Sequence, residues 1–300
     1  MIRFRRMIRP VVFSGKGLHS GEPSTVTVEP DPWQEGVILD VEGCSSPLRN
    51  CSFSGTGRGT DVSLPGHGPC VKTVEHLFSA LAGLGIFSFA RIRVKGPEIP
   101  AVDGCASFFS CALEEGSSSF EAGAGSMVVS PWGLPFPVAV EDREREALLA
   151  AFPGEELGIS YVIRYGGTPI GTMVSEYRPS RDDFQSHIAP ARTFALSSEM
   201  EKLRARGLAR GGSLENAILV EENQVLASGG LRFPDEFSRH KILDLLGDLY
   251  LLGRPLRARI VAIRAGHALH CRLVERLRKI RGSADSCAPS RNDAGTGTDK

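Results

Sequence analysis

The stretch "RHKILDLLGDLYLLG" (residues 239–253) decides how this sequence is interpreted. It is apolar almost throughout, which predicts a buried helix that begins after Asp235 as its N-cap. It nevertheless contains His240, Asp244 and Asp248, which are spaced four residues apart and therefore share one helix face. Because burial of a carboxylate without a partner is costly, these side chains need partners or a chemical role.

Two interpretations fit this polar stripe. In the first, His240 pairs with Asp244, and Lys241 or an arginine neutralises Asp248. In the second, His240 and Asp244 bind a metal ion, because an H-x-x-x-D pattern places an imidazole and a carboxylate one helical turn apart, as in many zinc sites. The isolated pattern does not decide between them.

A catalytic zinc site needs a third protein ligand and an open position for water. The segment "KTVEHLFSALAGLGI" (72–86) predicts a helix with Thr73 as N-cap, Glu75 in the first turn and His76 beside it. Adjacent helical residues point about 100° apart, so one can bind a metal while the other reaches its water. Alternatively, Glu75 only interacts favourably with the helix dipole and His76 is a core histidine.

A third histidine, His267, follows the strand pattern "RARIVAI" (257–263), at a junction between strand and helix. An imidazole held there can act as a general acid, or it can cap the helix. His270, one turn further on, fits the capping role better. His67 and Cys70 ("HGPC") imitate half a zinc site, but the absence of a second half favours a surface loop.

The whole chain is typical of a soluble two-domain protein, with 300 residues of which 41% are hydrophobic and 23% charged. Its zero net charge provides no field that would attract nucleic acid or an anionic membrane. No apolar run approaches the roughly 20 residues of a transmembrane helix. Seven scattered cysteines without a C-x-x-C pair indicate reduced thiols and the cytoplasm.

The pattern of elements indicates an α+β protein in two parts. Alternating stretches such as "TVTVEP" (25–30) and "ARIRVKG" (90–96) predict strands, and helical stretches separate them. We predict an N-terminal domain (1–122) and a C-terminal domain (123–282) that repeats the order of elements without repeating residues. Residues 283–300 lack apolar side chains and are predicted to form a disordered tail.

Several motifs in order carry a family resemblance from about Val12 to Arg281. They are "GKGLHSGEP" (15–23), "KTVEHLFSALAGLGI", "PEIPAVDG" (97–104), "ARTFAL" (191–196), "RGLARGGSLENAIL" (206–219), "LRFPDEFSRHKILDLLGDLYLLG" (231–253) and "AGHAL" (265–269). Together they resemble the UDP-3-O-acyl-N-acetylglucosamine deacetylases, zinc amidases that commit the lipid A pathway of Gram-negative bacteria. In "DGCAS" and "GHALHC", cysteines and a histidine stand where this family often has serine or asparagine.

The resemblance implies two similar α+β domains, each a small sheet layered with helices, with the active site in the cleft between them. It implies one Zn²⁺, with Fe²⁺ as an alternative in the cell, bound by His76, His240 and Asp244. Glu75 matches the general base. The implied substrate is UDP-3-O-acyl-N-acetylglucosamine, which would lose acetate in the cytoplasm on a monomeric enzyme that binds no nucleic acid and has no transmembrane segment.

The resemblance also assigns the remaining side chains. His267 matches an acid or cationic stabiliser, Asp248 its orienting carboxylate, and Thr193 a hydroxyl that assists the oxyanion. The residues matching substrate contacts are Lys241, Phe194 near the sugar, His19 on the nucleotide side, and Met200 and Leu203 in an acyl-chain passage.

Two other functions stay open from the residues. The first is a zinc amidase that acts on a different acylated sugar or amide. The second is a non-catalytic protein that binds a sugar nucleotide and uses the stripe as a network of salt bridges. Such a protein would contain no stoichiometric zinc.

Overall fold

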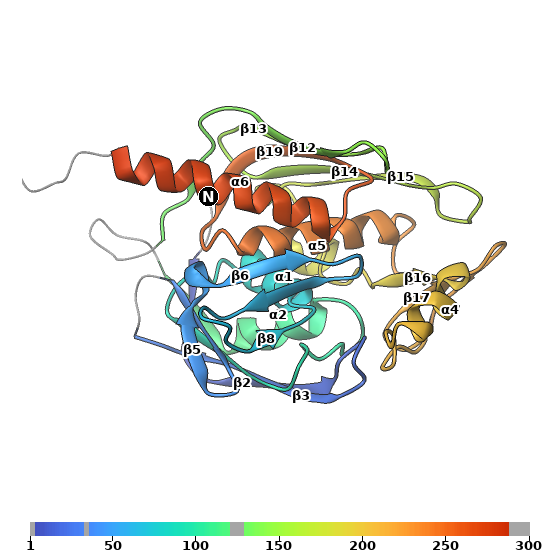
Figure 1. Ribbon diagram of the computed structural model, residues 1–300, viewed down its shortest axis with the longest axis horizontal. Helices are drawn as coiled ribbons and strands as arrows, with labels where there is room; N and C mark the ends of the chain where they lie inside the picture. The colour runs from blue at the N-terminus through green and yellow to red at the C-terminus, as the bar shows by residue number, and fades with distance from the viewer. Residues whose placement is uncertain (1–3, 33–35, 121–128, 288–300) are drawn as a thin grey trace, which may run out of the picture.

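The computed structural model describes residues 4–32, 36–120 and 129–287. Two sheets form the outer layers, and helices from both halves of the chain fill the layer between them (Figure 1). The principal helices are α1 (Glu75–Gly83), α2 (Ser107–Glu115), α5 (Glu236–Tyr250) and α6 (His267–Cys287).

The first sheet has the strand order β2-β3-β9-β4-β5. Strand β9 lies at its centre, antiparallel to β3 and parallel to β4, and hairpins add β2 and β5 at the edges. The predicted strands are confirmed, with the valines of β3 buried on one face. The bounds are β2 Val11–Lys16, β3 Pro23–Pro30, β4 Val37–Val41, β5 Cys44–Pro47 and β9 Ala90–Lys95.

The second sheet repeats this topology in the order β12-β13-β19-β14-β15, with the short β11 (Trp132–Gly133) also pairing with β19. Strand β19 again lies at the centre, antiparallel to β13 and parallel to β14. When the insertions described below are left aside, four strands of each sheet precede a helix, the central strand and a second helix. The bounds are β12 Val138–Asp142, β13 Ala147–Pro153, β14 Gly158–Tyr165, β15 Gly171–Tyr177 and β19 Leu256–Ile263.

Each half carries an insertion before its first helix. In the first half this is the small sheet of β6 (Ser52–Gly55), β7 (Thr60–Ser63) and β8 (Cys70–Val71). The second half inserts a longer segment, which extends to the right in Figure 1. Its elements are α3 Phe184–His187, β16 Phe194–Leu196, α4 Ser197–Ala205, β17 Ile218–Val220 and β18 Val225–Leu226.

Three short elements complete the described chain. Strand β1 (Phe4–Met7) pairs antiparallel with β10 (Ser117–Phe120), and the 3-10 helix η1 (Leu48–Asn50) follows β5. The predicted α+β class, with two similar units of a small sheet and helices, is confirmed. The predicted domain boundary between residues 122 and 123 lies outside the described residues.

Three details differ from the sequence predictions. Thr73 is not the N-cap of α1; that position is Val74, and the Thr73 hydroxyl donates to Glu98 instead. Asp235 is the N-cap residue of α5, but its carboxylate binds side chains elsewhere rather than capping the helix. Helix α6 runs to Cys287, past the predicted start of the tail at residue 283, and residues 288–300 lie outside the described chain.

Helix α5 is apolar on nearly every side because it lies in the middle of the molecule. It packs against α1 of the other half, against α6, and against β14 and β15 of its own sheet. Removal of its leucine side chains from water stabilises the fold by about 25 cal/mol for each Å² of apolar surface buried. The same burial leaves its few polar side chains to find partners inside the protein, which they do on the side that faces α1 and α6.

Candidate active site

Helices α1 and α5 approach each other closely at Gly247. A Cβ on Gly247 would lie 2.0 Å from the backbone oxygen of Glu75, so only glycine permits this contact. The approach brings the first turn of α1 against the polar stripe of α5. The ring centroids of His76 and His240 are consequently 5.1 Å apart, although the two residues come from different halves of the chain.

Replacing Gly247 with alanine is therefore expected to separate the two helices. We expect the free energy of unfolding in urea to fall by about 1–3 kcal/mol, the usual cost of overpacking a core. Gly282→Ala is the matched control, because Gly282 also lies in a helix but its Cβ would meet nothing within 4 Å. Equal stability of the two variants would contradict the role of this contact.

Three buried side chains converge beside the crossing. His240 Nε2 lies 3.3 Å from Asp244 Oδ1, and His76 Nε2 lies 3.7 Å from the same oxygen. One potential ligand atom from each of the three lies within 4.8 Å of the others. His240 Nδ1 donates to the carbonyl of Ala191 at 3.0 Å, which leaves Nε2 without a proton and directed at the cluster.

The protonation states of this cluster suit a cation. Burial lowers the pKa of His76 to about 3, and burial also lowers the pKa of His240. Burial opposes ionisation of Asp244, but the His240 imidazole and the Lys241 ammonium hold the pKa of Asp244 well below its usual range. Lys241 Nζ donates to Asp244 Oδ2 at 2.8 Å. The cluster therefore offers two neutral imidazoles and one ionised carboxylate.

This donor set fits a divalent transition metal. Catalytic zinc sites commonly have three protein ligands of histidine and carboxylate type and keep one position for water or substrate. The outer nitrogen of His240 is bound to a carbonyl, as the ligands of such sites usually are. His76, His240 and Asp244 are thus a candidate metal centre, as the resemblance implied.

Glu75 lies next to the cluster but is not one of its three members. It is 2% exposed, and its Oε2 accepts a hydrogen bond from the backbone N–H of Thr60 at 3.0 Å. Burial raises the pKa of Glu75 to about 8. Its other oxygen, Oε1, is 3.9 Å from His267 Nε2. This carboxylate can therefore exchange a proton near neutral pH.

Asp248 holds His267 by a hydrogen bond of 2.8 Å from His267 Nδ1 to Asp248 Oδ2. Burial disfavours the charge on this imidazole, yet Asp248, followed by Glu75, raises the pKa of His267 to about 9. Its Nε2 points toward the cluster, 3.7 Å from Asp244 Oδ2. The expectation that Lys241 or an arginine neutralises Asp248 was wrong, because Lys241 binds Asp244 and the partners of Asp248 come from α6 and β7.

Two partners of Asp248 were missed or misread in the sequence. Thr60 donates to Asp248 Oδ1 at 2.6 Å, and the sequence around Thr60 gave no signal of this contact. His270 was interpreted as a helix cap, but its ring is fully buried and its Nδ1 lies 2.7 Å from Asp248 Oδ2. The spacing of three residues between His267 and His270 could have indicated a shared helix face.

The residues matched to substrate contacts line one cavity of about 260 Å³ together with the metal cluster. Phe194 lies above the cluster, with its ring centroid 6.3 Å from that of His240 and 5.4 Å from Lys241 Nζ. Met200 and Leu203 of α4 supply part of an apolar wall. The lining residues matched in the sequence are His19, Glu75, His76, Thr193, Phe194, Met200, Leu203, His240, Lys241, Asp244 and His267.

Thr193 reaches this cavity from the start of the second insertion. Its backbone N–H donates to the carbonyl of Gly104 at 2.8 Å. Gly104 has a φ of +77°, and a Cβ there would lie 1.9 Å from the backbone oxygen of Asn216, which explains the glycine in "PAVDG". On the opposite wall, His19 Nε2 is 3.3 Å from the carbonyl of Arg58, and His19 Nδ1 is buried without a partner.

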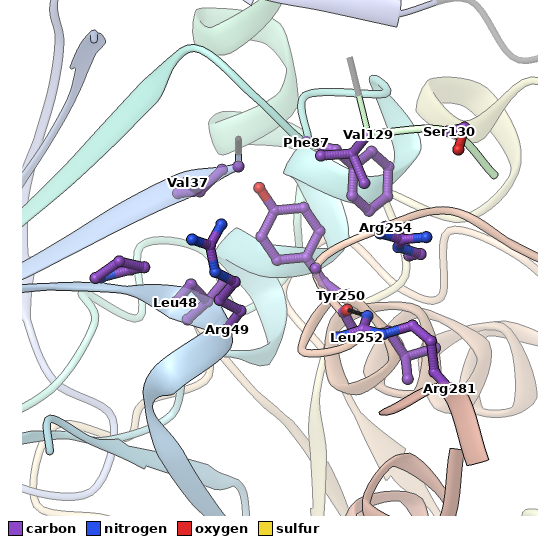
Figure 2. A pocket seen from close by; sticks show the side chains of 13 residues that line it. Val37, Leu48, Arg49, Phe87, Val129, Ser130, Tyr250, Leu252, Arg254 and Arg281 are labelled. Carbon is purple, nitrogen blue, oxygen red and sulfur yellow. Dashed lines mark hydrogen bonds between the residues drawn. The ribbon is translucent and has the colours of Figure 1, made fainter. Parts of the chain in front are cut away.

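A smaller adjoining cavity of about 190 Å³ shares Lys241, Phe194 and His267 with the first. Three arginines, Arg58, Arg145 and Arg264, line it together with the acidic Asp142 and Glu199. A separate cavity of about 380 Å³ lies at the C-terminal end of α5, where Tyr250 and Arg254 contribute to the wall (Figure 2). None of the matched site residues lines this third cavity. His67 and Cys70 are both exposed. His67 lies in a turn, as predicted, but Cys70 is the first residue of strand β8 rather than part of a loop.

Comparison with known proteins agrees with this geometry. Residues 5–279 match the family described as LpxC, UDP-3-O-acyl N-acetylglycosamine deacetylase. The UDP-3-O-acyl-N-acetylglucosamine deacetylase of Anaeromyxobacter dehalogenans (strain 2CP-C) is 38% identical, over 95% of this chain and 93% of the relative. That of Chlamydia muridarum (strain MoPn / Nigg) is 40% identical, over 88% of this chain and 91% of the relative.

The family match covers nearly the whole chain, and the relatives are similar over most of their length. Both agree with the buried His/His/Asp cluster between the two α+β halves. The chain belongs to the UDP-3-O-acyl N-acetylglycosamine deacetylase family.

Proposed function

We propose that this protein hydrolyses the N-acetyl group of UDP-3-O-acyl-N-acetylglucosamine, giving acetate and the free amine, the committed step of lipid A biosynthesis. The observation that carries the proposal is the metal cluster of His76, His240 and Asp244 with Glu75 beside it, in a chain of this family. The proposed ion is Zn²⁺, with Fe²⁺ as the alternative in the cell. A divalent ion in this cluster would polarise the acetamide carbonyl and lower the pKa of the attacking water.

Glu75 is the proposed general base. Burial raises its pKa to about 8, which makes the carboxylate a stronger base, and a cation bound beside it would favour the ionised form that accepts the proton. The amide nitrogen must be protonated before the amine leaves. Glu75, after it has taken the proton, and His267, as an imidazolium, both carry a proton that they can supply, and both line the cavity beside the candidate metal centre.

His267 and Thr193 are proposed to stabilise the oxyanion. Asp248 raises the pKa of His267 to about 9, so the imidazole is a cation at neutral pH. Thr193 lines the same cavity and contributes a hydroxyl donor. Donors fixed in a water-poor site do not need to reorganise as charge develops, which makes them effective in the transition state.

The two joined cavities suit the two ends of the proposed substrate. Lys241, Arg145 and Arg264 line the smaller cavity and can pair with a diphosphate. The larger cavity has an apolar wall to which Met200 and Leu203 contribute, and this wall can hold the 3-O-acyl chain. Phe194 lines both cavities and is proposed to contact the sugar. His19 lines the larger cavity and is proposed to contact the nucleotide side.

The location and assembly state are also proposals. Among the described residues, no helix is both long enough and apolar enough to cross a bilayer. The six cysteines whose side chains the structure describes are free thiols, which favours a reducing compartment such as the cytoplasm. We propose that the enzyme acts there as a monomer, and its mass in solution by light scattering tests the assembly state.

Changing His267 to alanine is expected to lower kcat by about 10²–10³-fold while KM changes much less, because the imidazolium acts mainly on the developing oxyanion. Steady-state kinetics with measured metal content tests this. Unchanged turnover with full metal content would remove His267 from the mechanism.

The pH dependence of kcat/KM is expected to have an alkaline limb as His267 loses its proton. Because Asp248 raises the pKa of His267, the imidazole stays active at neutral pH. Asp248→Asn removes that carboxylate, so the alkaline limb should move to lower pH by about one to three units. A limb at the wild-type position in this variant would contradict the assignment.

An acetate-release assay on the purified protein tests the function itself. We expect activity on UDP-3-O-acyl-N-acetylglucosamine, loss of activity with a chelator, and recovery on addition of Zn²⁺ or Fe²⁺. Faster release of acetate from another N-acetyl sugar would favour the amidase with a different substrate. A protein that binds the sugar nucleotide but contains no stoichiometric metal would be the non-catalytic alternative.

A further inference from the structure

Asp248 is an unusual carboxylate because it is fully buried and receives side-chain donors from two other elements. Thr60 of β7 donates to its Oδ1 at 2.6 Å. His267 and His270, both from the first turn of α6, bind Oδ2 at 2.8 Å and 2.7 Å. The proposed mechanism uses only His267. It assigns no role to the Thr60 hydroxyl or to the His270 imidazole, although both are fully buried.

His270 is itself held from its far side. Its Nε2 lies 2.9 Å from the hydroxyl of Tyr161 on β14. The same hydroxyl is 2.8 Å from the carbonyl of Ala265, two residues before His267. Its single proton can bind either acceptor. Tyr161 thus links the sheet of the second half to both the loop that presents His267 and the ring that contacts Asp248.

We propose that His270 is a positioning residue that, together with Thr60, fixes the Asp248 carboxylate in the orientation that directs His267 Nε2 at the metal cluster. This inference rests on the proposed function. Asp248 needs more than its contact with His267 to hold that imidazole in place. A carboxylate bound by a single donor can rotate about its Cβ–Cγ bond. Donors at both oxygens, from β7 and α6, prevent that rotation and compensate the buried charge.

The geometry separates the two nitrogens of His270 by role. The Nδ1 proton is required at Asp248, because an ionised carboxylate can only accept a hydrogen bond. The Nε2 contact with Tyr161 anchors the ring. An asparagine at 270 can place its amide nitrogen close to the position of Nδ1, whereas a glutamine reaches the position of Nε2. The two variants therefore place the same amide group at different positions. Asparagine places it next to Asp248, and glutamine places it next to Tyr161.

His270→Leu is expected to lower kcat by about 10–100-fold, the size typical for loss of a partner that orients an active-site group, with KM and metal content changed little. His270→Asn should recover most of kcat, and His270→Gln should not. If the leucine variant does not fold, the Asn and Gln pair still decides. Equal kcat values for Asn and Gln, or recovery by Gln alone, would overturn the proposal.

A second readout does not depend on activity. In the ¹H NMR spectrum of the metal-loaded protein with labelled histidine, the Nδ1 proton of His267 bound to Asp248 should give a strongly downfield resonance, assigned by its loss in His267→Ala. This resonance should persist in His270→Asn and be lost or shifted in His270→Gln. An unchanged resonance in both variants would reject the positioning role, whereas an inactive wild type with this pattern would reject only the proposed function.

Discussion

Glu75→Gln is expected to lower kcat by about 10²–10⁴-fold while the protein keeps its full content of metal. The amide has the shape of the carboxylate but cannot accept a proton, so the variant removes the general base. The three cluster residues are unchanged, and Glu75 is not one of them. The backbone N–H of Thr60 can still bind the amide oxygen, so the local fold should persist.

The measurement is kcat on the purified variant, with metal determined on the same sample. Glu114→Gln is the matched control, because Glu114 is half-exposed on α2 and belongs neither to the cluster nor to the lining of its cavity. It should have wild-type kinetics. Loss of metal from Glu75→Gln would identify Glu75 as a ligand and overturn the assignment of the base.

His240→Ala is expected to lose the metal and, with it, deacetylase activity down to background. The loss of affinity should exceed the roughly 10–100-fold that follows removal of an outer partner of a ligand. Two groups would remain for the ion, and Asp244 would be left with Lys241 as its close partner at 2.8 Å. This salt bridge would compete with the metal ion for the Asp244 carboxylate.

Metal affinity by competition with a chelator tests this prediction directly. His187→Ala is the control, because His187 is exposed on α3 and is not part of any buried cluster among the described residues. The control should bind metal as the wild type does. Full metal content in His240→Ala would show that the ion is bound elsewhere, and the proposed centre would then be wrong.

The elements of the fold were largely predictable because their signals are local. The alternation in β3 and β9 and the apolar run of α5 are written in neighbouring residues, and the structure confirms them. The details at helix ends were less predictable. Thr73 has the residue type of an N-cap, but it stands one residue before the N-cap position with a φ of +57°, and its hydroxyl donates to the buried Glu98 at 2.9 Å.

The candidate site was predictable in part and for a different reason. The spacing of His240 and Asp244 indicated a chelate, while the roles of His76, Glu75 and His267 came from the family resemblance. The sequence indicated the partners of these charges only in part. Helical spacing favours Asp244, three residues from Lys241, over Asp248, which is about two turns away. The partners of Asp248 come instead from β7 and α6, which only the fold brings to it.

By itself, the sequence determined the helices, the strands and the set of polar side chains that must be buried, because hydrophobic periodicity acts over a few neighbouring residues. Only the tertiary structure decided the partners of those side chains. Thr60 and Asp248 are 188 residues apart in the chain, and the close crossing at Gly247 joins the two halves. Such contacts depend on how whole elements pack, and a buried charge accepts whichever donor that packing brings within reach.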